Sequence, residues 1–162
     1  MNGGRRIWVV DDDRNTRLAL TEGIADEGFE VTGFACAEDV VAESARGTPD
    51  LLIADLVLPG GMNGLGLLRH FKSTAADAAV IMVSGEGTLS TAVEAMKDGA
   101  ADFITKPVRL RELLKTVARV LETRQLVAEN TRLKEEVATL KGRFEIVGAE
   151  SGLREILEIV EQ

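Results

Sequence analysis

The chain has 162 residues, of which 45% are hydrophobic, and it carries a formal net charge of -8. This length suits one ordinary core plus a short extra segment, and the acidic balance argues against a nucleic-acid-binding surface, which needs clustered lysine and arginine. One cysteine excludes an internal disulfide, and no apolar run is long enough for a membrane span or arranged as a signal peptide, so we expect a cytoplasmic protein.

Five short apolar runs, rich in β-branched residues, recur along the first 121 residues. They are residues 7–10, 31–34, 51–54, 80–83 and 103–105. After each of them, apolar residues recur at helical spacing, over residues 18–24, 40–45, 65–71, 89–96 and 110–120. Apolar strands that alternate with amphipathic helices predict an α/β domain, a doubly wound parallel sheet covered on both faces.

Polar residues follow four of the five predicted strands. Asp11 and Asp12 follow the first, Asp55 the third, Ser84 the fourth and Lys106 the fifth. In a doubly wound sheet the ligand site lies outside the carboxyl ends of the strands. We therefore expect three carboxylates, a hydroxyl and an ammonium group in one crevice.

This set of side chains predicts a metal site that supports phosphoryl transfer. Clustered carboxylates need compensating charge, and hard oxygen ligands in this arrangement suit Mg²⁺. We expect Asp55, alone at the central strand, to act as a nucleophile toward phosphorus. Lys106 and Ser84 would hold the transferred oxygens, and Asp12, with Asp11 behind it, would hold the metal. Asp13 is expected to cap the first helix instead.

Four stretches carry a family resemblance: VVDD (9–12), LLIADLVLPG (51–60), VIMVSGEG (80–87) and GAADFITKP (99–107). In this order and spacing they resemble the receiver domain of bacterial two-component response regulators, over residues 5–121. The resemblance implies a flavodoxin-like sheet of five strands in the order 2-1-3-4-5. It also implies that Asp55 accepts a phosphoryl group from a sensor histidine kinase.

The resemblance further implies a ligand set for Mg²⁺. By analogy with the family, Asp12, Asp55 and the main-chain carbonyl of Val57 bind the ion directly, and Asp11 binds it through water.

It also assigns the switch residues. Ser84 corresponds to the switch hydroxyl, Phe103 to the switch aromatic residue, and Lys106, before a cis Pro107, to the phosphoryl-binding lysine. Two features depart from the family pattern. The loop PGGMNG, residues 59–64, is one residue longer than usual, and Phe103 lacks the hydroxyl of the more familiar tyrosine, so a switch there would act by burial.

A heptad repeat follows residue 121. Leucines recur every seventh residue and define the d positions, with a polar residue and a valine at the a positions and opposite charges at g and e. The residues are Leu126, Leu133 and Leu140 at d, Asn130 and Val137 at a, Glu129 and Glu136 at g, and Lys134 and Lys141 at e. We expect residues 122–142 to form a parallel coiled-coil dimer; the alternative is a solvated extension of the last receiver helix.

Gly142 is expected to end the coil, and residues 143–162 to form a short extended piece and then an amphipathic helix capped at Ser151. The linker together with IVGAESGLREILEIV resembles the start of the AAA+ ATPase domain of sigma-54-dependent activators of the nitrogen-regulatory (NtrC) and dicarboxylate-transport types. The resemblance implies a truncated activator, whose receiver controls its own AAA+ domain and sigma-54 RNA polymerase. No nucleotide-binding loop is present, so we expect no ATPase activity.

The leading hypothesis is a regulatory domain controlled by phosphorylation. Phosphorylated Asp55 would draw in Ser84, repack the face formed by the fourth helix, fifth strand and fifth helix, and change how two receivers pair. One alternative is a phosphohydrolase of the haloacid-dehalogenase kind, but Asn15 stands where its motif wants Thr or Val. The other is an interaction module that is never phosphorylated, which the complete set of polar strand-end residues argues against.

Overall fold

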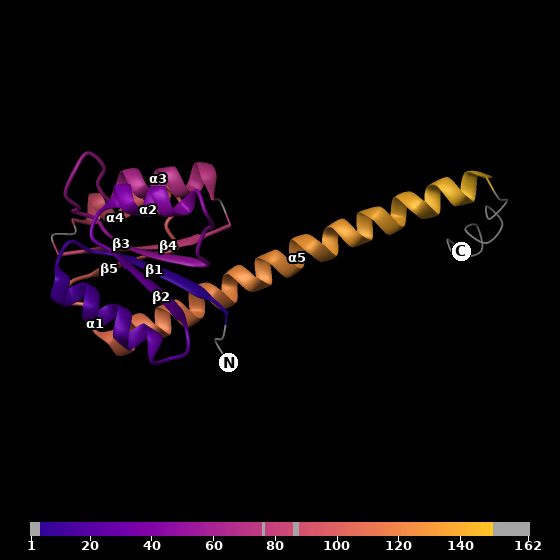
Figure 1. Ribbon diagram of the computed structural model, residues 1–162. Helices are drawn as coiled ribbons and strands as arrows, with labels where there is room; N and C mark the ends of the chain where they lie inside the picture. Colours follow the sequence, from indigo (N-terminus) through magenta and orange to yellow (C-terminus); the bar gives the residue numbers. More distant parts are fainter. Residues whose placement is uncertain (1–3, 76, 86–87, 151–162) are drawn as a thin grey trace. The chain divides into compact units, whose positions relative to one another are not determined.

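The computed structural model describes residues 4–75, 77–85 and 88–150, with residues 144–150 described by their backbone alone. In this part of the chain, parallel strands form one sheet in the order β2-β1-β3-β4-β5 (Figure 1). The strands are β1 (Arg6–Val10), β2 (Glu30–Phe34), β3 (Leu51–Asp55), β4 (Ala79–Ser84) and β5 (Asp102–Thr105). The predicted fold class and strand order are confirmed.

Helices cover both faces of this sheet. They are α1 (Arg14–Ala25), α2 (Ala37–Ser44), α3 (Gly64–Thr74), α4 (Leu89–Lys97) and α5 (Leu110–Glu150). Figure 1 shows α1 and the start of α5 on one face, and α2, α3 and α4 on the other. The alternation of strands and helices in the sequence therefore becomes three layers.

The central strands β1, β3 and β4 are buried on both faces, and successive residues enter opposite halves of the core. In β1, Ile7 packs on the side of α1 and α5, whereas Trp8 packs on the side of α2 and α3. The Trp8 ring meets Phe34 and Phe71 edge-on, with ring centroids 5.2 and 6.4 Å apart. Each large side chain buried in this way stabilises the fold by about 1.5–3 kcal/mol. The carboxyl ends of the central strands are therefore held firmly in place.

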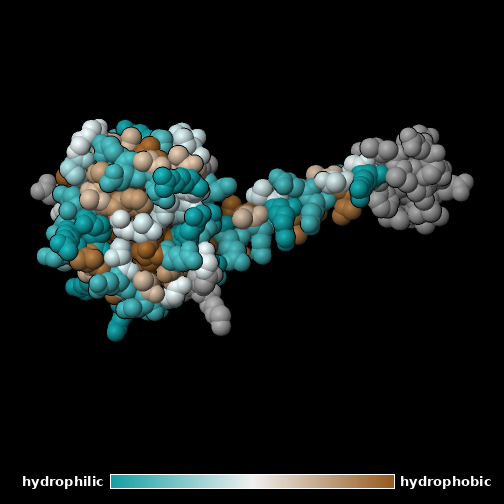
Figure 2. Space-filling model, in the orientation of Figure 1, coloured by the Kyte–Doolittle hydropathy of each residue, from teal (hydrophilic) through white to brown (hydrophobic). Residues whose placement is uncertain are grey.

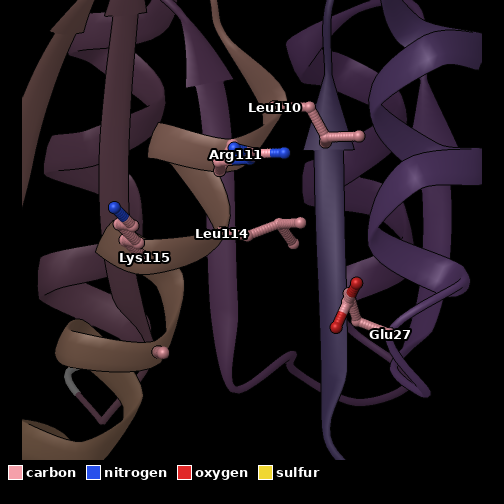
Figure 3. A pocket seen from close by; sticks show the side chains of 6 residues that line it. Glu27, Leu110, Arg111, Leu114 and Lys115 are labelled. Atoms are coloured by element: carbon pink, nitrogen blue, oxygen red, sulfur yellow. The ribbon is translucent and has the colours of Figure 1, made fainter.

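Helices α1 and α5 approach closely at one point. A Cβ added to Gly23 would lie 2.4 Å from Leu110 Cδ2, so the absence of a side chain at Gly23 makes room for Leu110. Beside this contact, a shallow groove is lined by Glu27, Leu110, Arg111, Leu114, Lys115 and Ala118 (Figure 3). The contact fixes the start of α5, and with it the turn after β5 that carries Lys106.

Polar side chains cap several helices, among them α1 and α3. Asp13 accepts a hydrogen bond of 3.3 Å from the Thr16 amide at the start of α1, so the cap predicted at Asp13 is confirmed. Asn63 accepts one of 2.9 Å from the Gly66 amide at the start of α3. Both caps direct how the chain leaves the sheet edge.

Helix α5 continues past Gly142. The extended segment expected after Gly142 is wrong, because α5 runs to Glu150. Gly142 does not have the positive φ with which glycine ends a helix, and a glycine inside a helix costs only about 1 kcal/mol relative to alanine. The helix predicted from Ser151 onward lies outside the described residues.

The chain divides into two compact units between Glu122 and Thr123. In the first unit, Leu113 and Val117 of α5 pack under the sheet. In the second unit, apolar side chains of α5 such as Leu126 and Leu133 are exposed, and Figure 2 shows hydrophobic residues among hydrophilic ones along this part of the helix. Across residues 4–75, 77–85 and 88–150, no helix is both long enough and apolar enough to cross a membrane.

A substitution at Gly64 tests the packing of α3 against the end of β3. A Cβ at Gly64 would lie 2.2 Å from the Asp55 carbonyl oxygen and 2.7 Å from Leu56 Cα. We predict that Gly64→Ala lowers the free energy of unfolding by about 1–3 kcal/mol, because α3 must shift away from the end of β3. Urea denaturation measures the change. In the matched control Gly61→Ala the nearest atom is 3.8 Å away, so a loss below about 0.5 kcal/mol is expected; equal losses in the two variants would contradict the packing argument.

Candidate functional site

Three aspartates predicted to bind a metal come together at the carboxyl edge of the sheet. Asp11 follows β1 and is 2% exposed, Asp55 ends β3 and is 6% exposed, and Asp12 is exposed. One carboxylate oxygen from each of the three lies within 4.8 Å of the others. We call Asp11, Asp12 and Asp55 the acidic cluster. It forms because β1 and β3 are neighbours in the sheet and end at the same level.

Lys106 reaches this cluster from the far end of the domain sequence. Its ammonium nitrogen lies 2.8 Å from Asp55 Oδ2 and 3.1 Å from Asp11 Oδ2. The Lys106 amide also donates a hydrogen bond of 2.8 Å to the Ser84 carbonyl. The peptide bond from Lys106 to Pro107 is cis, as the resemblance implies. The strand-end cation predicted from the sequence therefore contacts two of the three carboxylates.

Backbone amides orient the two buried carboxylates. The Val57 amide donates to Asp55 Oδ1 over 3.2 Å, and the Asp13 amide donates to Asp11 Oδ1 over 2.9 Å. In each carboxylate the other oxygen, Oδ2, faces Lys106. Each buried aspartate is thus held by one amide and one ammonium group.

Arg17 also contributes to the site, which the sequence analysis did not foresee. Its Nη1 donates a hydrogen bond of 2.7 Å to the main-chain carbonyl of Asp11. A cation in the first turns of the helix that follows Asp11 is the only signal in the sequence, and such residues more often face solvent. Arg17 thus fixes the backbone of Asp11 without pairing with a carboxylate of the cluster in the contacts described.

Burial and charge act in opposite directions on the two ionisable partners. Burial raises the pKa of Asp11, and the hydrogen bonds from the Asp13 amide and Lys106 only partly oppose it. Burial lowers the pKa of Lys106, but the bonds to Asp55 and Asp11 outweigh this, and the net shift is upward. Lys106 is therefore held in its charged form. Within this group of four side chains, three carboxylates and one ammonium group leave two negative charges unbalanced.

The donor set of the acidic cluster fits Mg²⁺. The ion prefers hard oxygen ligands, is bound through one or two carboxylates, and keeps further positions for water and phosphate oxygens. Asp12 leaves one carboxylate of the cluster open to solvent, and a divalent cation would balance the remaining negative charge. Val57, whose carbonyl is expected as a further ligand, is the second residue beyond β3 and is 65% exposed.

The two predicted switch residues lie on neighbouring strands. Ser84 ends β4, is 1% exposed, and follows Val83, which pairs with Asp55 in the sheet. Phe103 lies in β5 and is half-buried against the core on the side of α3 and α4. The phosphoacceptor candidate and the aromatic ring are therefore separated only by β4.

Comparison with known protein families identifies the family of the domain that carries this site. The response regulator receiver domain matches residues 7–118 of the chain. The chain belongs to this family. Acceptance of a phosphoryl group is the general function of receiver domains, and the family resemblance seen in the sequence is confirmed.

Individual relatives of the chain are transcriptional regulators. The chain is 33% identical over 148 residues to the C4-dicarboxylate transport transcriptional regulatory protein DctD of Rhizobium meliloti, and the match covers 91% of this chain and 32% of that protein. It is 36% identical over 115 residues to the DNA-binding transcriptional regulator NtrC of Salmonella typhimurium, which covers 71% of this chain and 24% of that one. The chain spans about a third or less of these relatives.

A solved structure shows the same likeness in three dimensions. The structure of NtrX from Brucella abortus in complex with ADP superimposes with a TM-score of 0.75 at 36% identity, and covers 79% of this chain and 29% of that one. The receiver domain is thus similar to the receiver-containing part of a longer regulator.

Asp11→Asn tests how much the buried charge of Asp11 lowers the free energy of unfolding. A group with a raised pKa stabilises the fold below its unfolded pKa, and this stabilisation is lost as the pH rises through the folded pKa. Because burial raises the pKa of Asp11, its charged form is unfavourable at neutral pH. We predict that Asp11→Asn without Mg²⁺ raises the free energy of unfolding by about 0.5–2 kcal/mol, measured by urea denaturation. The control Asp39→Asn, at an exposed position of α2, is expected to change little; a less stable Asp11→Asn would refute the argument.

Proposed function

We propose that Asp55 of this receiver domain accepts a phosphoryl group from a sensor histidine kinase, with Mg²⁺ bound by Asp12, Asp55 and the Val57 carbonyl and, through water, by Asp11. The observation that carries the proposal is the position of Lys106, whose ammonium nitrogen is 2.8 Å from Asp55 Oδ2. A cation at this distance from the nucleophile also meets the phosphoryl oxygens once they arrive there.

Different residues of the chain have different roles in the proposed phosphoryl transfer. An oxygen of Asp55 forms the new bond to phosphorus while the bond from phosphorus to the donor breaks, and the donor leaves with the electron pair. Lys106 is held charged and stabilises the negative charge on the transferred oxygens. The Val57 amide keeps the Asp55 carboxylate oriented. Mg²⁺, when bound, would supply further positive charge to stabilise the transferred oxygens.

The phosphorylated site would act on helix α4 through Ser84 and Phe103. Ala95 is the only buried residue of α4, and Leu89, Val93 and Met96 of this helix are 82%, 43% and 47% exposed. A helix with so little buried surface is readily repositioned. In this proposal the Ser84 hydroxyl contacts the phosphoryl group, Phe103 becomes more buried, and the face of α4, β5 and α5 changes how two receivers pair.

The second unit would pair two copies of the chain through residues 122–142. Leu126, Leu133, Val137 and Leu140 are between 52% and 62% exposed in the single chain, and they fall at a and d positions of the heptad. A parallel coiled coil buries such residues and places Glu129 and Glu136 opposite lysines of the partner. Exposed apolar residues at this spacing support dimerisation over a solvated helix.

In the whole protein, the phosphorylated dimer would control the assembly of a following AAA+ domain that acts on sigma-54 RNA polymerase in the cytoplasm. The likeness to NtrC- and DctD-type regulators supports this role. The segment expected to begin the AAA+ domain, residues 143–162, lies largely outside the described part of the chain. The receiver itself is proposed to act without multiple turnover of a substrate.

Phosphorylation of Asp55 is tested with a small-molecule phosphodonor, such as acetyl phosphate, and Mg²⁺. We predict one phosphoryl group per chain by intact mass spectrometry, stable in acid and labile in base, and none in Asp55→Asn. Beryllofluoride with Mg²⁺ should protect the wild type against proteolysis and leave Asp55→Asn unchanged. Steady hydrolysis of a phosphomonoester would instead favour the phosphohydrolase, and equal behaviour of wild type and Asp55→Asn would favour an interaction module that is never phosphorylated.

Leu133→Glu tests the coiled coil. A carboxylate at the d position faces its copy in the partner helix, so we predict that the dimer dissociates at least about tenfold more readily, a cost of about 1.4 kcal/mol. Sedimentation velocity over a concentration series measures the change. Ala138→Glu adds the same carboxylate at an exposed b position and should leave the dimer intact. A wild-type monomer, or equal effects of the two substitutions, would speak for the solvated helix.

A further inference from the structure

The loop that follows the phosphoacceptor strand is held by a side chain from a different helix. Glu38, in the first turn of α2, accepts hydrogen bonds at the same oxygen, Oε1, from the amides of Gly61 and Met62, at 2.9 and 3.1 Å. Both amides belong to the loop PGGMNG, residues 59–64. Glu38 thus satisfies two backbone donors of this loop.

The loop passes so close to Glu38 that its sequence is restricted there. Gly60 has a φ of +91°, in the left-handed region that favours glycine. A Cβ at Gly60 would also lie 2.8 Å from Glu38 Oε1. At Gly61, by contrast, the nearest atom to an added Cβ is 3.8 Å away. The left-handed backbone and the nearby Glu38 carboxylate therefore both favour glycine at position 60.

The carboxylate is also held in the form that accepts these bonds. Hydrogen bonds from the amides of Glu38 itself, Gly61 and Met62 lower the pKa of Glu38, together with one from the Cys36 side chain, and outweigh the effect of burial. Glu38 therefore remains ionised at neutral pH while it holds the loop.

Both ends of the loop are held by main-chain hydrogen bonds, and the Val57 amide donates to Asp55 Oδ1 over 3.2 Å. The Leu56 amide donates to the Val83 carbonyl over 2.8 Å, and the Gly64 amide donates to the Leu56 carbonyl over 2.9 Å. Leu58 is buried. Between these points Val57, with its mostly exposed side chain, carries the carbonyl proposed as a metal ligand. A second attachment at Gly61 and Met62 restricts the paths that this segment can take.

We propose that Glu38 is a positioning residue for the metal site: by holding the Gly61 and Met62 amides it sets the path of the loop, and thereby directs the Val57 carbonyl toward the acidic cluster. This inference rests on the proposed function, because it concerns how the same site holds Mg²⁺. Glu38 touches neither the cluster nor the transferred group, so its effect is on binding of the ion rather than on the transfer step.

The experiment measures Mg²⁺ binding by calorimetry without a phosphodonor, and separately the Mg²⁺ dependence of phosphorylation by acetyl phosphate. Removing a residue that supports a metal ligand typically weakens metal binding 10- to 100-fold, and an effect through a loop is smaller. We expect Glu38→Ala to raise the Mg²⁺ concentration for half-saturation about three- to tenfold, with an unchanged phosphorylation rate at saturating Mg²⁺. Hydrogen exchange of the Gly61 and Met62 amides should become faster.

Two further variants make the outcome decisive. Glu38→Gln keeps an acceptor oxygen and should bind Mg²⁺ nearly as the wild type does. Asp39→Ala removes a neighbouring exposed carboxylate of α2 and should also behave as the wild type.

The inference is overturned if Glu38→Ala binds Mg²⁺ like Asp39→Ala, or if Glu38→Gln is as defective as Glu38→Ala. The proposed function fails separately, if the wild type binds no Mg²⁺ or if Asp55→Asn is phosphorylated as the wild type is.

Discussion

The contact of one ammonium group with two buried carboxylates joins residues at the ends of three strands of the receiver domain, β1, β3 and β5. Lys106 lies at 2.8 Å from Asp55 and 3.1 Å from Asp11, although 51 and 95 residues separate the partners in the sequence. Only a parallel sheet with β1 and β3 adjacent, and with β5 ending at the same edge, brings them together. The core side chains in both layers hold those strand ends in register, and the packing of Leu110 against Gly23 fixes the chain beyond β5.

One partner in this contact, Asp11, is a buried group whose charge is energetically unfavourable for the domain. Burial raises the pKa of Asp11, so its charge weakens the folded state at neutral pH. Functional sites commonly keep such groups at the expense of stability. The excess negative charge of the acidic cluster favours binding of a divalent cation, and the charged Lys106, 2.8 Å from Asp55, would stabilise an anionic phosphoryl group in the proposed function. Stability and function are in direct opposition at this edge of the sheet.

The sequence predicts those parts of this structure that follow from repeating patterns or from positions at the ends of strands. Strand periodicity, the order of the strands and the cap at Asp13 follow from local patterns, and the strand-end rule brings Asp11, Asp55, Ser84 and Lys106 to one edge. The contacts of Arg17, Glu38 and Gly64 were missed because each depends on a tertiary neighbour that no local pattern reveals. Gly142 does not end α5, since helical residues on both sides outweigh the modest cost of one glycine.

Amide hydrogen exchange with and without beryllofluoride and Mg²⁺ tests whether Asp55 is the phosphoacceptor, because it shows which segments become protected at the site. We expect slower exchange in the segments that carry the proposed phosphoryl-binding groups, at Leu56 and Val57, at Ser84, and at Lys106, and altered exchange in α4. No such change should occur in Asp55→Asn. Protection confined to other segments, or the same protection in Asp55→Asn, would contradict the assignment of Asp55 as the phosphoacceptor.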